Sequence, residues 1–295
     1  MIRSFDHREF PASRVLDAKR GRRISVCLPA RNEAATVGGV VGAIRRDLME
    51  RRPVVDELVV IDDGSADATA AVAAAAGADV VTASSVLPGY GTEHGKGQAL
   101  WRGLHVTTGE VVVYCDTDIC DFDPAFVLGL AGPLLARDDV TFVKGCYERP
   151  LHGHPGEGGR VTELMARPLI SLLFPQLASL HQPLAGECAG RRDVLEAVPF
   201  VGGYGVDLAL LIDVADRFGT AGLVQCDLGR REHRNRALGE LGAQSLAILQ
   251  MALRRAGHDL DPWSPSLLRP GAEAVAIPFV ERPPLADVPA HRKTA

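Results

Sequence analysis

Short apolar runs alternate with longer helix-like segments between residues 24 and 116, and this alternation constrains the fold more than any other feature of the chain. The runs that predict strands are residues 24–29, 56–62, 79–83 and 109–116. The segments between them predict helices that start near residues 34, 67 and 96. A strand that is apolar along its whole length is typical of a parallel sheet covered on both faces. The pattern therefore predicts an α/β fold with a doubly wound, mostly parallel sheet and helices on both faces.

The alternation weakens after residue 148, and this change suggests how the chain is divided. Residues 1–22 are polar and helix-prone, so we expect an arm outside the core. Residues 23–148 and 149–258 are predicted to be two halves of one domain. In the second half we expect helices near 160–174, 205–219 and 239–257 and a strand at 222–229. Residues 259–295 form the tail, and from residue 260 onward it holds seven of the nineteen prolines, which predicts an extended segment lying on the body or on another subunit.

The composition narrows the range of partners. Of 295 residues, 46% are apolar and 23% are charged, and the net charge is −5, so we do not expect a nucleic-acid partner. No apolar run approaches the roughly 18 residues that span a bilayer, and the N-terminus lacks the apolar core of a signal peptide. We therefore expect a cytoplasmic protein without a membrane partner. Six cysteines without a CxxC pair predict reduced residues of the core.

Asp116 and Asp118 follow the last apolar run of the alternation, in the sequence VVVYCDTD. Ligands of open parallel sheets bind beyond the carboxyl ends of the strands. Two carboxylates at such an end suit Mg²⁺ or Mn²⁺, which prefer oxygen ligands and often share them with substrate phosphates. The same side chains could instead cap or solvate a turn, and the tripeptide alone leaves both interpretations open. Asp123, which precedes Pro124, is expected to start a helix.

Other motifs with similar residues fit less well. Phosphohydrolases of the D-x-D type carry Thr or Val in the fifth place of the motif, where this chain has Cys120. The stretch also lacks the further oxygen ligands of a calcium-binding loop. The loop before Lys96 lacks the spacing of a P-loop, and Gly97 stands where Ser or Thr is needed. Lys96 at a predicted helix start is still a candidate for anion binding, with a solvated surface lysine as the alternative.

Two further stretches could bind anions. The sequence REHRNR, residues 231–236, follows the predicted strand at 222–229, and its arginines could neutralise phosphates that a carboxylate pair would repel. His233 in this stretch is either a metal ligand or a polar turn residue. The sequence GGRVTE, residues 158–163, places two glycines, Arg160 and Thr162 at a predicted helix start, which can receive a phosphate or carboxylate. A plain junction between loop and helix is the alternative for this stretch.

Taken in order along the chain, several stretches resemble the glucosyl-3-phosphoglycerate synthase family of retaining glycosyltransferases with the GT-A fold. The resemblance runs from about residue 24 to 257 and extends to ERPPLADVP in the tail. The stretches that carry it are CLPARNEAATV, VVIDDGSADAT, HGKGQALW, VYCDTD, GGRVTELMARPL, QPLAGE, GYGVDLALLID and HRNR. The first and fourth are shared by GT-A glycosyltransferases in general, whereas those of the second half are more specific.

The resemblance implies a hexosyltransferase that moves glucose from a nucleotide-sugar, usually UDP-glucose, to the 2-hydroxyl of 3-phospho-D-glycerate. It also implies a Mg²⁺ (or Mn²⁺) cofactor, retention of the α configuration and, together with the tail, a homodimer. Residues 23–148 would be the half that binds the nucleotide-sugar donor. Residues 149–258 would be the half that binds the small phosphorylated acid acceptor.

Residue roles follow from the same resemblance. Donor-binding residues would be Pro29, Ala30, Glu33, Asp63, Lys96, Asp116, Thr117, Tyr204, Asp207 and Arg231. Asp118 and His233 would be the protein ligands of the metal. The acceptor would meet Gly159, Arg160, Thr162 and Asn235. The catalytic group would comprise Asp116, Asp118, Asp207 and Arg231.

The chain departs from the family pattern at Asp207, where Glu is usual, and at Asp63, where a small residue such as serine is frequent. A diverged GT-A glycosyltransferase is therefore an alternative, with GDP-mannose or a specialised sugar nucleotide as donor, or with another small acceptor in secondary metabolism. From other classes, a D-x-D phosphohydrolase and a nucleotide-sugar-binding protein without turnover are the alternatives.

Overall fold

The computed structural model describes residues 1–148, 159–231, 238–260, 265–289 and 291. Within these residues the main sheet has eight strands, in the order β1-β9-β6-β7-β5-β2-β3-β4. The strands are β1 (Arg3–Asp6), β2 (Ile24–Ala30), β3 (Glu57–Asp62), β4 (Asp79–Thr82), β5 (Val111–Tyr114), β6 (Phe142–Glu148), β7 (Cys188–Arg191) and β9 (Leu223–Arg230). All neighbours pair in parallel except β7, which is antiparallel to both β5 and β6. The predicted mostly parallel sheet is confirmed.

Strand β5 shows why the apolar runs are uninterrupted. Val112 and Tyr114 belong to the hydrophobic core on one face of the sheet, and Val111 and Val113 belong to the core on the other face. Successive side chains of a strand point to opposite faces. Since both faces of β5 are buried, every position along it must be apolar, and the strand places Asp116 and Asp118 at the point where burial ends.

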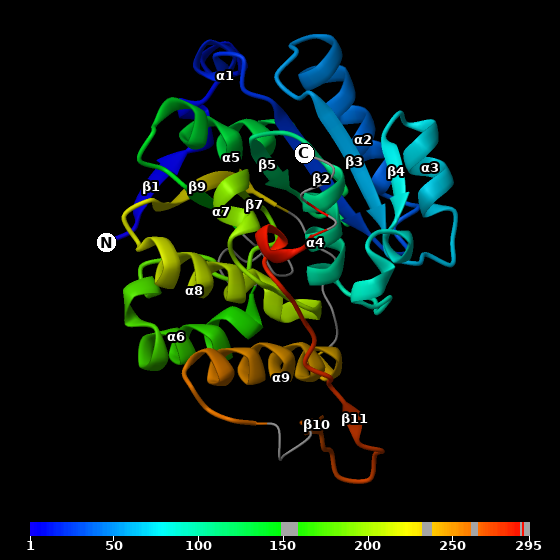
Figure 1. Cartoon of the computed structure of the whole chain (residues 1–295), viewed down its shortest axis with the longest axis vertical. Helices are drawn as coiled ribbons and strands as arrows, with labels where there is room; N and C mark the ends of the chain where they lie inside the picture. Colours follow the sequence, from blue (N-terminus) through cyan, green and yellow to red (C-terminus); the bar gives the residue numbers. More distant parts are fainter. Residues whose placement is uncertain (149–158, 232–237, 261–264, 290, 292–295) are drawn as a thin grey trace.

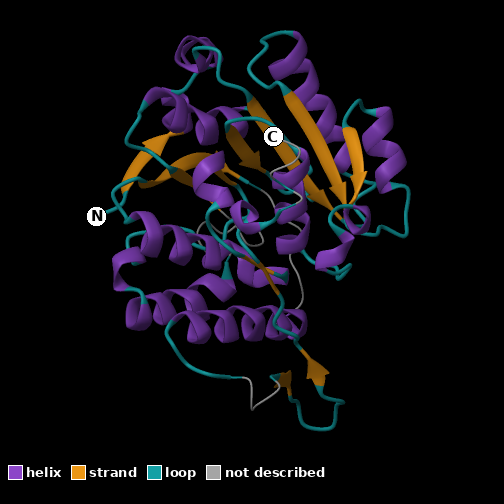
Figure 2. Ribbon diagram, viewed as in Figure 1, coloured by secondary structure: helices purple, strands orange, loops and turns teal. Residues whose placement is uncertain are grey.

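Helices cover both faces of the sheet, as predicted (Figures 1 and 2). One core includes buried residues of α1 (Ala12–Lys19), α2 (Val37–Ile44), α3 (Thr69–Ala75) and α5 (Ala125–Ala136). The other includes residues of α4 (Lys96–Val106), α6 (Arg167–Leu173), α7 (Arg192–Glu196), α8 (Val206–Phe218) and α9 (Leu238–Arg255). Two stretches of the described chain are π-helical: Arg45–Glu50 continues α2, and Thr162–Ala166 precedes α6. None of the helices in the described part of the chain is long and apolar enough to cross a bilayer.

The prediction of an N-terminal arm outside the core is wrong. Arg3–Asp6 forms β1, which pairs in parallel with β9 at the edge of the main sheet. Ile2, Phe10 and Val15 are buried around it. The strand is short and carries two charged residues, so its sequence gives little strand signal, and it is the pairing with β9 that supplies its backbone hydrogen bonds. The boundaries between the parts of the chain stay a prediction.

The described part of the tail has two short pairs of strands. β10 (Ser266–Leu267) and β11 (Val275–Ala276) form an antiparallel hairpin that projects beyond α9 (Figure 1). β12 (Glu281–Arg282) pairs antiparallel with β8 (Phe200–Val201), which leads into α8. Leu285 and Val288 then enter the core. This last part of the tail therefore lies on the body of the same chain, which is one of the two places predicted for it.

All six cysteines lie within the described residues and are free. Five are buried, and burial raises the pKa of their thiols, to about 12 for Cys146 and Cys188. The expectation of a core position is wrong for Cys120, which is exposed because it lies in the turn after β5. The five buried thiols behave as small apolar side chains.

Candidate active site

A cleft of about 470 Å³ opens at the carboxyl ends of β2, β3 and β5. This volume is typical of sites for small molecules. The cleft is lined by every described residue that the sequence assigns to donor, acceptor or metal binding except Arg231, which lies behind it. Those lining residues are Pro29, Ala30, Glu33, Asp63, Lys96, Asp116, Thr117, Asp118, Gly159, Arg160, Thr162, Tyr204 and Asp207. His233 and Asn235, predicted for metal and acceptor, lie outside the described residues.

Backbone and side-chain hydrogen bonds tie the three strand ends together. The Asp63 N–H donates to the carbonyl oxygen of Ala30, at 2.9 Å, which continues the pairing of β2 and β3. The Thr117 hydroxyl donates to the carbonyl oxygen of Pro29, also at 2.9 Å. Because these bonds cross from strand to strand, residues distant in sequence share one rigid floor of the cleft.

The carboxylate of Asp63 connects the end of β3 to the start of α4. One oxygen accepts from the N–H of Gly95 at 2.7 Å, and the other lies 3.3 Å from His94 Nδ1. Burial raises the pKa of Asp63, although these two partners act in the opposite direction. Asp63 therefore has a structural task in addition to lining the cleft, since it fixes the residue that precedes Lys96.

Lys96 is placed between two carboxylates. Its Nζ lies 2.8 Å from Asp116 Oδ1 and 3.4 Å from Asp207 Oδ2. Burial alone would lower the pKa of the ammonium, but the negative charges of Asp116 and Asp207 outweigh it and raise that pKa well above its usual value. Lys96 is a charged, largely buried part of the site, so the alternative of a solvated surface lysine is wrong.

Arg231 supports both aspartates of the D-x-D stretch from behind. One end of its guanidinium, Nη2, lies 2.9 Å from Asp118 Oδ1 and 3.6 Å from Asp116 Oδ2. The other end, Nη1, donates to a carboxylate oxygen of Glu187 and to the Tyr147 hydroxyl, the latter at 3.0 Å. Burial would lower the pKa of Arg231, but Glu187 and the neighbouring acids outweigh it and raise that pKa. The planar fork of arginine suits this role because it can bond at both ends at once.

Three buried residues of the site were not predicted from the sequence. Lys144, in β6, donates to the carbonyl oxygen of Asp207 at 3.3 Å and lies 3.8 Å from its Oδ1. Glu187 and Tyr147 hold Arg231 as described above. The side chains of Lys144 and Glu187 are 1% and 0% exposed. A charged residue inside an apolar run, as in FVKGCYE, signals that a partner must exist, because unpaired buried charge is costly, but it does not identify the partner.

Gly186 lies two residues before β7 and allows the chain to approach the site closely. A Cβ atom at this position would lie 2.0 Å from Asp116 Oδ2. Any other residue type would displace the carboxylate. The side chain of Asp116 is thus held in place by Lys96 on one side, Arg231 on another and the Gly186 backbone on a third.

The D-x-D carboxylates fit a hard divalent cation. Asp118 is 40% exposed toward the cleft, so it can reach a ligand while one of its oxygens is paired with Arg231. Carboxylate oxygens together with phosphate oxygens are the ligands that Mg²⁺ and Mn²⁺ prefer. In the described part of the chain, no group of three or more acidic, His or Cys side chains could hold a metal. Asp123 differs, since its carboxylate accepts from the N–H of Ala125, the first residue of α5, at 2.8 Å. It therefore lies at a helix start as predicted, although the N-cap position is that of Pro124.

The opposite side of the cleft is formed by the start of the helix that contains Thr162–Ala166 and α6. Gly159, Arg160 and Thr162 line it. The carbonyl of Gly159 accepts from the Glu163 N–H at 3.1 Å, and Thr162 is buried. The helix start therefore faces the same space as Asp118, so the predicted anion site and the predicted cation site open into one cleft.

Comparisons with known proteins agree with this geometry. A family model described as Glycosyl transferase family 2 matches residues 25–197. The glucosyl-3-phosphoglycerate synthase of Mycolicibacterium smegmatis is 50% identical over 244 residues, which cover 81% of this chain and 80% of that protein.

Two solved structures extend the likeness to almost the whole chain. Glucosyl-3-phosphoglycerate synthase from Mycobacterium tuberculosis, in complex with Mn²⁺, UDP-glucose and phosphoglyceric acid, has a TM-score of 0.88 and 41% identity, covering 97% of this chain and 98% of that one. Mannosyl-3-phosphoglycerate synthase from Rubrobacter xylanophilus also has a TM-score of 0.88, with 39% identity, covering 97% of both chains. The two proteins share phosphoglycerate in their names and differ in the sugar.

Proposed function

The chain belongs to glycosyl transferase family 2 and, within it, to the glucosyl-3-phosphoglycerate synthases, and we propose that it transfers glucose from UDP-glucose to the 2-hydroxyl of 3-phosphoglycerate. One observation supports this proposal above the others. The D-x-D carboxylates and the helix start at Gly159–Arg160 line the same cleft, so a nucleotide-sugar and a phosphorylated acid can meet there. An enzyme that acted on one anion alone would not need both features.

On the donor side, Pro29, Ala30, Glu33 and Asp63 hold the nucleoside, and Asp116 and Thr117 lie beside the ribose and the sugar. Asp118 and His233 would hold the divalent cation, which would supply positive charge beside the diphosphate of the donor. Structures of the Mycobacterium tuberculosis synthase contain UDP with Mn²⁺ or Mg²⁺. Arg231 brings a buried positive charge to the same place and offsets the repulsion between the aspartates and the phosphates.

On the acceptor side, the backbone of Gly159, the side chains of Arg160 and Thr162, and Asn235 hold the phosphate and carboxylate of phosphoglycerate. A helix start offers N–H groups and a partial positive charge to such an anion. The acceptor carries several negative charges, and this explains why the chain needs a second cationic position apart from Lys96 and Arg231.

Retention of configuration follows from a displacement on one face of the sugar. The bond between the sugar carbon and the diphosphate oxygen breaks, the acceptor 2-hydroxyl bonds to that carbon from the same face, and its proton passes to the departing phosphate oxygen. Asp207, which faces the sugar with Tyr204, is paired with Lys96 and Lys144. A carboxylate held by two ammonium groups is a weak nucleophile. Isolation of a glycosylated Asp207 from a slowed variant would contradict this mechanism.

We also propose that the enzyme is a cytoplasmic homodimer. Leu164 and Leu172, on the helix that leads into and forms α6, are 77% and 81% exposed, which would suit a subunit contact. Light scattering of the purified protein should give twice the mass of one chain, and a single-chain mass would contradict the dimer.

A panel of UDP-, GDP- and ADP-sugars with Mg²⁺, each with and without 3-phosphoglycerate, tests the reaction. We expect release of UDP only when UDP-glucose and 3-phosphoglycerate are both present. Release of GDP from GDP-mannose in their place would make the enzyme a mannosyltransferase. Phosphate release without a nucleotide would indicate a phosphohydrolase, and donor binding without release would indicate a binding protein.

The identity of the sugar has its own test at Asp207. This residue is one methylene shorter than the glutamate usual in the family, and a displacement of about 1 Å at a reacting group can change rates about a hundredfold. We expect Asp207→Glu to change the ratio of kcat/KM for UDP-glucose over UDP-mannose. Asp216→Glu, on the exposed face of the same helix, is the matched control. An unchanged ratio in Asp207→Glu would remove this residue from sugar selection.

A further inference from the structure

The tail strand β12 lies next to a loop that lines the donor side of the cleft. Glu281 and Arg282 pair with Val201 and Phe200 of β8. The pairing continues at Gly202, whose N–H donates to the carbonyl oxygen of Val280 at 2.7 Å. The next residues, Gly203 and Tyr204, line the cleft. The tail thus supports one wall of the cleft through its backbone.

The side chain of Arg282 reaches a second loop, residues 86–95. It is buried, and its guanidinium donates to the carbonyl oxygen of Tyr90 and pairs with the carboxylate of Glu93. A second buried guanidinium, that of Arg102 in α4, donates to the carbonyls of Gly91, at 2.6 Å, and Glu93, at 3.3 Å. Two arginines from distant parts of the chain therefore hold the backbone of this loop.

This loop leads directly into the donor site. Its last residues are His94 and Gly95, which bond to Asp63, and Lys96 follows them and pairs with Asp116. The position of the loop backbone therefore determines where the ammonium of Lys96 and the carboxylate of Asp63 lie. Both were assigned to the donor above.

The two loops also contact each other at the start of α4. A Cβ atom on Gly97 would lie 1.9 Å from the carbonyl oxygen of Val201, so the helix start is packed directly on β8. The Gly203 N–H donates to Gln98 Oε1 at 3.2 Å. A shift of β12 would therefore be transmitted to Lys96 by two routes, through the loop and through β8.

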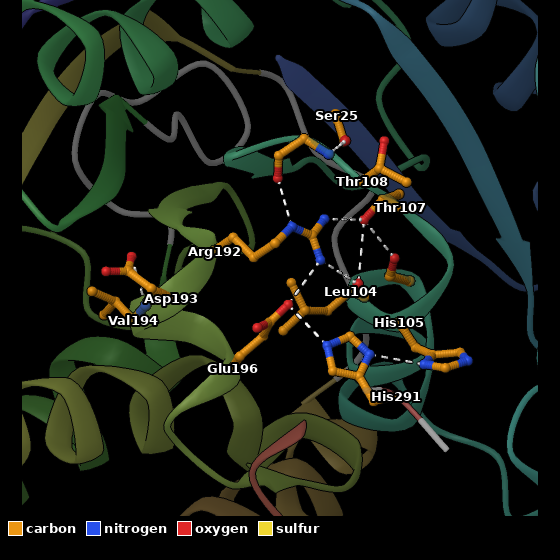
Figure 3. Close-up of polar contacts among 12 residues, drawn as sticks. Ser25, Leu104, His105, Thr107, Thr108, Arg192, Asp193, Val194, Glu196 and His291 are labelled. Atoms are coloured by element: carbon orange, nitrogen blue, oxygen red, sulfur yellow. Dashed lines mark hydrogen bonds and ion pairs between the residues drawn. The ribbon is translucent and has the colours of Figure 1, made fainter. Parts of the chain in front are cut away.

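The tail beyond β12 is fixed along the same helix. The indole N–H of Trp101 donates to the carbonyl oxygen of Pro283 at 2.8 Å. Near the far end of α4, His291 Nε2 lies 2.9 Å from Glu196 Oε1 and its Nδ1 lies 3.0 Å from His105 Nδ1 (Figure 3). Glu196 is itself paired with Arg192, at 3.1 Å. Anchors on α4 and α7 therefore hold the tail, so β12 is a fixed part of the body.

We propose that Arg282 is a positioning residue for the nucleotide-sugar donor, which acts through the 86–95 loop on Asp63 and Lys96 without touching the donor itself. The inference rests on the proposed function, because it takes these two residues to bind the donor. It gives the C-terminal tail a role in the reaction. It also specifies which substrate is affected, since the contacts that lead from Arg282 reach Asp63 and Lys96, both of which are assigned to the donor.

Arg282→Met tests the inference, because methionine keeps much of the buried length and removes the charge and the donors. The readouts are the affinity for UDP with Mg²⁺ by titration calorimetry and the KM values for both substrates. We expect UDP binding about tenfold weaker and an equal rise in KM for UDP-glucose, because loss of the charge-assisted bonds destabilises the loop position that donor binding needs. The KM for 3-phosphoglycerate should stay within about twofold. Arg282→Lys should recover part of the loss, because it keeps the charge without the fork.

Two further variants separate this role from general damage to the tail. Glu281→Gln is the matched control, because Glu281 neighbours Arg282 on β12 but pairs with Arg255 of α9, at 2.6 Å. Its UDP affinity should equal that of the unmodified protein. Glu93→Gln removes the partner of Arg282 at a side chain that is 53% exposed, so folding is preserved even where Arg282→Met fails to fold. It should weaken UDP binding, and the two effects should not add in the double variant.

The inference is overturned if UDP affinity is unchanged in Glu93→Gln and in any folded Arg282 variant, or if Glu281→Gln loses as much affinity as Arg282→Met. Failure of the proposed function gives a different result. In that case the unmodified protein binds no UDP with Mg²⁺, whereas failure of the inference alone leaves normal binding in the unmodified protein and no difference among the variants.

Discussion

The two sides of the cleft hold their charged groups in different ways. On the strand-end side, Asp116 and Asp118 are paired with Lys96 and Arg231, and buried groups behind them fix those cations. On the helix-start side, the groups proposed to bind the acceptor are the backbone and first side chains of one helix, including Arg160. The first arrangement ties donor binding to the stability of the fold. The second can change with little effect on the core, so substitutions on the two sides should have different consequences.

The largest effect is expected at the strand-end side, from Asp118→Asn. Removing one electrostatic partner of a transition state costs on the order of 10²–10³-fold in rate, and we expect a loss of this size together with loss of the Mg²⁺ dependence of UDP binding. Calorimetric titration of UDP with and without Mg²⁺ measures the second effect separately from turnover. Asp121→Asn, at the exposed position three residues further on, is the control. An unchanged Mg²⁺ dependence in Asp118→Asn would exclude Asp118 as a metal ligand.

The next largest effect is expected from Glu187→Gln, which should lower the free energy of unfolding. Removing one partner of a buried ion pair destabilises a protein by about 3–5 kcal/mol, because the other charge is left buried. We expect a loss near the lower end of this range, since the amide can still accept from Arg231, and it should be visible as a lower free energy of unfolding in urea. Asp47→Asn removes the exposed pair between Asp47 and Arg51, for which about 0.5 kcal/mol or less is expected. Equal losses in the two variants would contradict the buried support of Arg231.

A smaller and more selective effect is expected on the helix-start side, from Arg160→Ala. A hydrogen bond to a charged group contributes about 1.5–3 kcal/mol, so the KM for 3-phosphoglycerate should rise by about ten- to a hundredfold, while the affinity for UDP stays the same. Arg167→Ala, seven residues further along this helix and paired with exposed Glu163, is the control. A rise of equal size in the KM values of both substrates would show that Arg160 does not belong to an acceptor site.

The smallest effect is expected outside the cleft, where His291 of the tail contacts His105 and Glu196. Burial lowers the pKa of His105, and the neighbouring His291 adds to this. Near pH 6 the unfolded chain therefore binds more protons at this position than the folded chain, so this histidine makes the protein less stable as the pH falls below about 6.5. Glu196 and Arg192 face the same cluster through His291. We expect the free energy of unfolding of His105→Asn to depend less on pH between about 7 and 5.5.

The same substitution at His258, which is exposed after α9, should leave that pH dependence as it is in the unmodified protein. The pH dependence of each variant must be compared with that of the unmodified protein, because a second group also titrates in this range. Burial raises the pKa of Asp213 to about 6, and this carboxyl group acts in the opposite direction over part of the same range. A steeper pH dependence in His105→Asn would contradict a neutral, buried His105.

The sequence predicts the strand-end side of the cleft, and the strands that form it, better than the rest of the molecule. Each of β2, β3 and β5 is a continuous apolar run, and pairing between parallel strands brings their ends to one edge, so the sequence alone places Asp63 and Asp116 together. β7 breaks this regularity, because it is an antiparallel strand between β5 and β6 and its neighbours are distant in sequence. β1 and β12 are too short to give a pattern of their own.

Within the site, sequence reasoning reached the residues that line the cleft and missed those that support them. Lys144 and Tyr147 belong to β6, and Glu187 directly precedes β7. Their roles depend on tertiary pairing with Asp207 and Arg231. The same holds for Arg282, which is one arginine in a proline-rich tail until its contact with the 86–95 loop is seen. Local pattern marks a charge inside an apolar run, such as Lys144, and only the fold shows which other charges are buried and what they pair with.

The central claim is that one cleft joins UDP-glucose to 3-phosphoglycerate with retention. The most direct test is to incubate the protein with UDP-glucose, 3-phosphoglycerate and Mg²⁺ and to examine the product by mass spectrometry and proton NMR. We expect one new compound, an α-linked glucose on the 2-hydroxyl of 3-phosphoglycerate, formed in equal amount with UDP. Free glucose with UDP, a β-linked product, or glucose attached at another position would contradict the account.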